Sequence, residues 1–237
     1  MQKIVTKEID YLHGQELLKG FLAYPEEAKN IPGVLIVHDW AGLNAVYQER
    51  AIEIAKLGYV AFAADMYGMG RVGKNNQEKQ ALMHAAMQDG QYRERVAISL
   101  ELLRHLSGVN AQKIAAIGFC FGGLCVLDLA RSGASVCGVV SLHGLLHKSM
   151  QSSKCINAEI LVLHGYDDPM VTPQDVISFC QEMQQAKANF QINMYANTQH
   201  AFTNPEADDK EAGIVYQPDA ARKAFRAMRD FFTDLFV

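Results

Sequence analysis

Cys120 is the side chain in this sequence that best fits a nucleophile. It stands in residues 118–123, Gly-Phe-Cys-Phe-Gly-Gly, between an apolar run over 113–117 and a helical run that begins at Leu124. This order predicts a strand, a tight turn and a helix, with the apical side chain projecting from the carboxyl edge of a sheet. A sulfur at a helix start lies near unpaired N–H groups, which favour the thiolate. A buried structural cysteine in a glycine-rich turn is an equally good interpretation of the motif alone.

An acid and a base that suit a thiol nucleophile occur later in the chain. A nucleophile of this kind needs a base within hydrogen-bond reach and a third group that orients the base. Asp168 and His200 each follow a predicted strand, so nucleophile, acid and base come in the order known for hydrolases with this turn. Asp167 is an alternative acid, but Pro169 restrains the backbone of Asp168, which favours Asp168.

Several polar side chains stand at the carboxyl ends of predicted strands. They are Asp39, Cys120, His143, Asp168 and His200. In an open parallel sheet these ends face the same side, and ligands bind there. The backbone N–H groups of Trp40 and Phe121 are in the positions expected for an oxyanion hole, which stabilises the charge of a tetrahedral intermediate.

The periodicity of apolar residues predicts an α/β fold. Strands are expected over 4–10, 17–24, 34–37, 59–64, 113–117, 136–142, 160–164 and 190–195. Helices are expected over 44–57, 77–106 with a break near 89–90, 124–132, 173–187 and 218–235. We therefore predict a mainly parallel twisted sheet of about seven to eight strands with helices on both faces. An antiparallel hairpin that turns at 13–15 forms one edge.

Composition limits the classes of partner. The chain has 237 residues, of which 49% are hydrophobic and 20% charged, and no linker divides it, so we predict a single domain over 1–237. Its formal net charge of −4 offers no basic surface for nucleic acid or an anionic membrane. No apolar run reaches membrane-spanning length and the N-terminus lacks a signal-peptide core, which predicts a cytoplasmic protein. Five cysteines without a C-x-x-C pair predict reduced thiols.

Together these residues resemble the dienelactone hydrolase family of α/β-hydrolases. The similar stretches are Val34 to Leu43, Gly58 to Tyr67, Gly118 to Gly123, His164 to Val171 and His200 to Phe202. The resemblance implies an α/β-hydrolase fold and a catalytic triad of Cys120, Asp168 and His200. It also implies hydrolysis of small-molecule esters or lactones through a thioester, with no metal or organic cofactor. The residues expected to line the substrate pocket or to pair with the thiol are Asp39, His143, Tyr67 and Phe202. The protein is expected to be a monomer or a homodimer.

Two positions depart from the family pattern. Dienelactone-cleaving members have a glutamate that pairs with the resting thiol, and Asp39, one methylene shorter, stands in its place. They also bind the substrate carboxylate with arginines, one of them four residues after the catalytic histidine. Asn204 occupies that position, and no arginine lies between Arg71 and Arg93. These differences argue against dienelactone itself as the substrate.

Two other functions fit parts of the sequence. A thiol at a helix start also suits peroxide sensing, so a non-hydrolytic protein that binds ligands or senses redox state is the alternative. A disulfide sensor needs a resolving cysteine, and Cys125 is expected to point away from the pocket. A metal site at His143 and His147 has little support, because no acidic ligand lies nearby.

Overall fold

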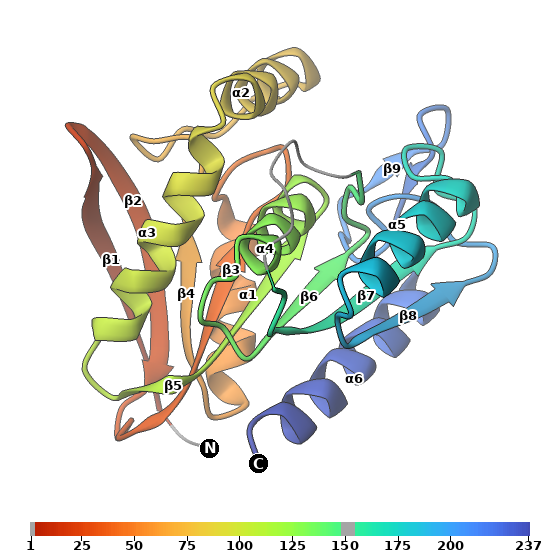
Figure 1. The fold of residues 1–237 in the computed structure, drawn as a ribbon. Coiled ribbons are helices and arrows are strands. Elements are labelled where there is room, and N and C mark those ends of the chain that lie inside the picture. Colours follow the sequence, from red (N-terminus) through yellow and green to blue (C-terminus); the bar gives the residue numbers. More distant parts are fainter. Residues whose placement is uncertain (1–2, 148–154) are drawn as a thin grey trace. The chain divides into compact units, whose positions relative to one another are not determined.

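The computed structural model describes residues 3–147 and 155–237 (Figure 1). Its eight main strands belong to one mainly parallel sheet, as the sequence predicts. The chain forms two compact units, Met1–Ile117 and Gly118–Val237, which are described separately below. The single domain over 1–237 remains a prediction. Within the described ranges, no helix is long and apolar enough to cross a membrane.

An antiparallel hairpin begins the first unit. Strands β1 (Ile4–His13) and β2 (Glu16–Pro25) pair along their whole length, from Ile4 opposite Pro25 to His13 opposite Glu16. The turn between them contains Gly14 at φ 60°, a conformation that glycine adopts without steric cost. Because β2 also pairs with β4 (Val60–Ala64), β1 is the outer strand, and the predicted edge hairpin is confirmed.

Two buried parallel strands form the centre of this unit. Strands β3 (Ile31–Val37) and β4 pair in parallel, and helix α1 (Ala45–Lys56) connects them. The helix begins at the predicted cap, where the Asn44 side chain accepts a hydrogen bond from the N–H of Val46. Both α1 and α3 (Gln91–His105) contact these strands, with α3 in front and α1 behind in Figure 1. This two-sided cover explains the continuous apolar runs.

The helical region predicted over 77–106 breaks into two helices near 89–90, as predicted. Helix α2 (Asn76–Gln88) ends before Gly90, whose φ of 65° breaks the helical path, and α3 follows directly. Of the residues in α2, only Ala86 is buried, so this helix packs loosely on its unit. Strand β5 (Val109–Phe119) then leads to Cys120.

The second unit repeats the alternation of helix and strand. Its elements are α4 (Phe121–Arg131), β6 (Gly138–Leu142), β7 (Glu159–Gly165), α5 (Pro173–Gln185), β8 (Phe190–Tyr195) and α6 (Pro218–Leu235). Strands β6, β7 and β8 are parallel neighbours. A Cβ on Gly138 would meet Leu235 of α6, whereas Ser141, which points to the other face, reaches Gly123 of α4. Helices therefore cover both faces of β6.

A small antiparallel ribbon in the second unit is absent from the sequence-based expectations. It pairs β9 (Asp208–Asp209) with β10 (Ile214–Val215). Strands of two residues carry no periodic pattern, so the sequence signal that reveals longer strands does not exist here.

Candidate active site

Cys120 occupies a strained turn between β5 and α4. Its φ of 52° and ψ of −114° lie outside the regions that a non-glycine residue normally adopts. Its N–H donates to the carbonyl oxygen of Leu142 at 3.1 Å, which fixes the turn to the end of β6. A Cβ on Gly118 would lie 1.9 Å from the carbonyl oxygen of Gly122, so only glycine allows this path. The side chain of Cys120 is nearly buried, with 8% of its surface exposed.

A second glycine lets α4 pack closely beneath the turn. A Cβ on Gly123 would lie 2.5 Å from the Cα of Gly144 and 2.6 Å from the hydroxyl oxygen of Ser141. The backbone of α4 therefore passes directly over the end of β6. Glycine is required on both sides of Cys120 because Gly118 and Gly123 each lie too close to neighbouring backbone to carry a Cβ.

Asp168 and His200 lie in direct contact. The Nδ1 of His200 donates to Oδ2 of Asp168 at 2.7 Å, and both side chains are buried. The other carboxylate oxygen of Asp168 accepts hydrogen bonds from the N–H groups of Met170 at 2.8 Å and Val171 at 3.2 Å. The alternative acid, Asp167, is exposed. The structure thus places Asp168 beside His200.

Backbone contacts hold the loops that carry these two residues together. A Cβ on Gly165 would lie 2.4 Å from the carbonyl oxygen of Thr198, so the two loops touch where the glycine lies. The N–H of Tyr166 donates to the carbonyl of Tyr195 at 2.9 Å, and that of Asp167 donates to Thr198 at 3.0 Å. The distance from Asp168 to His200 is therefore set mainly by main-chain atoms.

The ribbon that the sequence did not reveal fixes the backbone of His200. The N–H of His200 donates to the carbonyl of Gly213 at 2.9 Å, and its own carbonyl accepts from the N–H of Val215 at 3.0 Å. Gly213 has φ 69° and lies against Pro169. Gly213 followed by Ile214 and Val215 is the one sequence signal of this element, and it is too short to interpret alone.

The electrostatics of His200 favour its charged form. Burial lowers its pKa, but the charge of Cys120 and the hydrogen bond with Asp168 outweigh burial and raise the pKa from 6.5 to about 10. Its Nε2 is buried and forms no hydrogen bond of regular geometry within the described part of the chain. We therefore attribute the influence of the Cys120 sulfur on the His200 pKa mainly to charge.

His143 and Phe202 pack against His200. The ring of His143 lies 5.3 Å from that of His200 and 5.4 Å from that of Phe202, edge to face in both cases. A hydrogen bond of 2.8 Å joins Nε2 of His143 to the hydroxyl of Thr203. His143 has φ 39°, a second strained backbone at a strand end. The structure therefore brings together the predicted residues of the second unit.

The predicted residues of the first unit form their own group. The hydroxyl of Tyr67 donates to the carbonyl of Trp40 at 3.0 Å, and the N–H of Ala41 donates to Asp39 at 2.8 Å. Burial raises the pKa of Asp39, while the hydrogen bonds from Ala41 and Tyr47 act in the opposite direction. Asp39 thus also closes the turn that follows β3.

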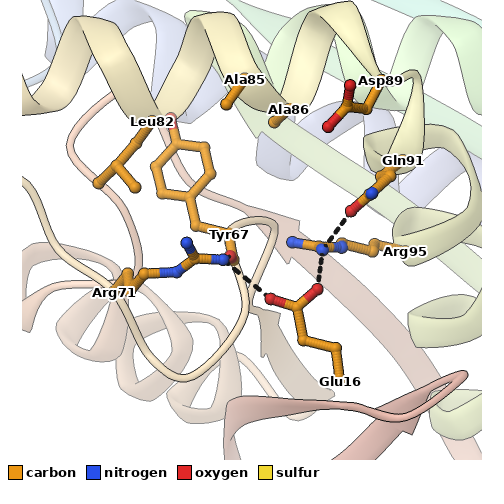
Figure 2. A pocket seen from close by; sticks show the side chains of 9 residues that line it. All are labelled: Glu16, Tyr67, Arg71, Leu82, Ala85, Ala86, Asp89, Gln91 and Arg95. Carbon is orange, nitrogen blue, oxygen red and sulfur yellow. Dashed lines mark hydrogen bonds and ion pairs between the residues drawn. The ribbon is translucent and has the colours of Figure 1, made fainter.

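Tyr67 lines a pocket of about 230 Å³ in the first unit (Figure 2). Figure 2 shows Glu16 bridging the guanidinium groups of Arg71 and Arg95, and the Arg71 contact measures 2.8 Å. Arg95 also donates to Gln91 at 2.5 Å. Arg71 is half-exposed, whereas Arg95 is buried. Sequence reasoning did not identify this ionic group, because no local pattern links Glu16 to arginines far along the chain.

The five cysteines, which all lie in the described ranges, form no disulfide, and His143 and His147 differ in exposure. Cys125 is fully buried within α4. Over residues 3–147 and 155–237, no three His, Cys, Asp or Glu side chains cluster as a metal site. His143 is buried, whereas His147 is exposed.

The fold and the turn around Cys120 define the class of protein: an α/β hydrolase. The family follows from a direct match, because residues 18–236 fit the model of the dienelactone hydrolase family. The chain belongs to that family.

Two solved structures and one relative of similar sequence agree with this assignment. The chain is 34% identical to a protein named m3DLH, with a TM-score of 0.93 and 99% of both chains covered. It is 32% identical to P91, a dienelactone hydrolase-like promiscuous phosphotriesterase from metagenomic libraries, with a TM-score of 0.92 and 99% of both chains covered. It is 27% identical to a probable 2-oxo-3-(5-oxofuran-2-ylidene)propanoate lactonase from Bradyrhizobium, over 86% of this chain and 84% of the relative.

Proposed function

We propose that this protein hydrolyses small carboxylic esters or lactones with Cys120 as the nucleophile. The observation that carries the proposal is the buried hydrogen bond between His200 and Asp168, on an imidazole whose pKa the Cys120 charge helps to raise to about 10. An imidazole in this state holds a proton taken from a thiol and leaves a thiolate ready to attack. Membership of the dienelactone hydrolase family and the lactonase from Bradyrhizobium support the substrate class.

The proposed reaction has two halves. In the first, the Cys120 sulfur bonds to the carbonyl carbon, the C–O bond of the ester breaks, and the leaving oxygen takes the proton held by His200. In the second, His200 removes a proton from water, and the hydroxide attacks the thioester. The carboxylic acid leaves, and the thiolate and protonated His200 are restored. Asp168 stays ionised throughout and stabilises the imidazolium.

Two backbone donors are proposed to stabilise the tetrahedral intermediates. These are the N–H groups of Phe121, the first residue of α4, and Trp40, which follows β3. The loss of one such donor typically costs about 100- to 1,000-fold in rate. Asp39 is proposed to pair with the resting thiol, with Tyr67, His143 and Phe202 around the substrate.

The substrate is proposed to be a small ester or lactone other than dienelactone. Asn204 stands where an arginine would bind the carboxylate of that compound, which supports a neutral or differently charged acyl group. We further propose that the protein acts in the cytoplasm, where cysteines such as its five thiols stay reduced, and that it is a monomer or homodimer.

Turnover of p-nitrophenyl acetate by cysteine variants tests the proposal. We expect Cys120→Ala to lose hydrolysis, and Cys180→Ala, a half-buried thiol on α5, to keep it. Rapid acid quenching followed by peptide mass spectrometry should find one acetyl group on Cys120. Full turnover by Cys120→Ala, or an acetyl group only on another residue, would contradict the proposal.

Phosphotriester hydrolysis is a second candidate, because the similar structure P91 is named a promiscuous phosphotriesterase. Diethyl p-nitrophenyl phosphate should then be cleaved by the wild type and not by Cys120→Ala. Absence of cleavage by wild-type protein that is active on esters would exclude this candidate alone.

The alternative of a redox sensor needs a partner thiol for Cys120. Cys125 is fully buried in α4. Peroxide titration with mass mapping should find a disulfide of Cys120 if the alternative holds, and only its sulfenic or higher acids if Cys120 is a nucleophile without a resolving thiol.

A further inference from the structure

His164 is a buried histidine next to the triad to which the proposed reaction assigns no role. It lies near the end of β7, and none of its surface is exposed. Its Nε2 lies 3.0 Å from the carbonyl oxygen of Val171. A carbonyl only accepts hydrogen bonds, so Nε2 carries the hydrogen and donates it.

The other ring nitrogen of His164, Nδ1, is buried and has no hydrogen-bond partner among the residues that the structure describes. Burial lowers the pKa of His164, which favours the neutral ring with its hydrogen on Nε2. A buried polar atom without a partner destabilises a fold, so the unpaired Nδ1 offsets part of the stability that the Nε2 hydrogen bond contributes. Histidine at this place therefore needs a reason other than stability.

The contacts of Val171 supply that reason. Its carbonyl is held by His164, while its N–H and that of Met170 donate to Oδ1 of Asp168. Thr172, the next residue, is the N-cap of α5. The segment of Met170 and Val171 thus accepts a hydrogen bond from His164 through the Val171 carbonyl and donates two to the Asp168 carboxylate.

We propose that His164 is a positioning residue that, through the Val171 carbonyl, holds the turn that aims Oδ2 of Asp168 at His200. This inference rests on the proposed function, since it gives His164 a task in the same triad. It identifies a hydrogen-bond donor three contacts away from the His200 ring, and no part of it requires His164 to touch the substrate.

Two substitutions separate positioning from packing. His164→Leu removes the unpaired nitrogen but also the donor to the Val171 carbonyl, so the two effects on stability oppose each other and the melting temperature should change little. The substitution should lower kcat for p-nitrophenyl acetate by about 10- to 100-fold with little change in KM, because a misplaced catalytic group acts on the chemical step. His164→Gln places an amide N–H close to the position of Nε2, and should recover most of the loss.

A proton NMR measurement reads the positioned bond directly. The proton between Nδ1 of His200 and Asp168 should resonate far downfield in the wild type and in His164→Gln. It should shift or broaden in His164→Leu. Wild-type kcat and an unchanged resonance in His164→Leu would overturn the inference, as would a His164→Gln protein no better than His164→Leu.

The design also separates this inference from the function on which it rests. A wild type without Cys120-dependent turnover would refute the proposed function, while the downfield proton would still report whether His164 positions Asp168. A wild type with that turnover and an unaffected His164→Leu protein would refute the inference alone.

Discussion

Replacing Asp168 with asparagine tests the electrostatic core of the proposed mechanism. Asparagine keeps the shape of the side chain, and its oxygen can still accept from the N–H groups of Met170 and Val171. The change removes the negative charge that faces His200. In the folded protein, the ring nitrogen and the carboxylate oxygen are 2.7 Å apart, and neither side chain is reached by solvent to a significant extent.

The size of the effect follows from this geometry. Two unit charges about 4 Å apart interact by about 4 kcal/mol at an effective dielectric constant of about 20. A barrier higher by about 4 kcal/mol slows a reaction by about 1,000-fold. We therefore expect kcat/KM of Asp168→Asn to fall by about 1,000-fold. The His200 pKa should also fall toward its ordinary value, because the hydrogen bond with Asp168 and the charge of Asp168 both raise the His200 pKa.

Initial rates on p-nitrophenyl acetate between pH 5 and pH 10 measure both effects. Asp167→Asn is the matched control, because Asp167 is exposed and contacts Thr198 only through its backbone N–H. It should stay within about twofold of the wild type, as surface changes usually do. If Asp168→Asn loses less than tenfold while circular dichroism shows a native fold, or if Asp167→Asn loses as much, the reasoning fails.

Three further changes test other contacts. Gly165→Ala should lower the free energy of unfolding by about 1–3 kcal/mol, because the added Cβ would lie 2.4 Å from the Thr198 carbonyl oxygen. Urea titration measures this, and wild-type stability would show that the loops after β7 and β8 are free to separate. Thr203→Val should cost about 1–3 kcal/mol by removing the hydroxyl bonded to Nε2 of His143, and thermal unfolding with no change would show that this bond contributes nothing. Stability should also decline as pH rises from about 6.5 to about 10, since folding raises the His200 pKa from 6.5 to about 10 and the unfolded chain loses this proton first. His200→Asn should have a flatter profile in the same urea titrations, and equal slopes would contradict the raised pKa.

Much of the secondary structure follows from local sequence. Apolar runs identify β3 and β4 because helices cover both sides of those strands, which leaves no polar face to interrupt the pattern. Helix limits follow from local chemistry: the Asn44 cap begins α1, the Thr172 cap begins α5, and Gly90 separates α2 from α3. Each of these signals acts within a few residues, which is why a sequence alone can reveal it.

The site shows where such reasoning stops. The order of Cys120, Asp168 and His200 was visible in the sequence, because each follows a strand. The ribbon that fixes His200 was not, because its strands have two residues each. Nor was the donor role of His164, which depends on a contact with the Val171 carbonyl. These features arise from close packing in three dimensions, for which the sequence has no periodic signature.

Main-chain hydrogen bonds link the loops after β7 and β8, and this affects which residues of the loops can be substituted. Because Tyr166 is linked through its N–H to the carbonyl of Tyr195, its side chain contributes nothing to that bond. The side chains of Tyr166 and Met170 are 53% and 45% exposed. Random libraries at these two positions should therefore accept a wide range of residues. Substitutions there would change the exposed surface beside the site and leave Asp168 and His200 in their present positions.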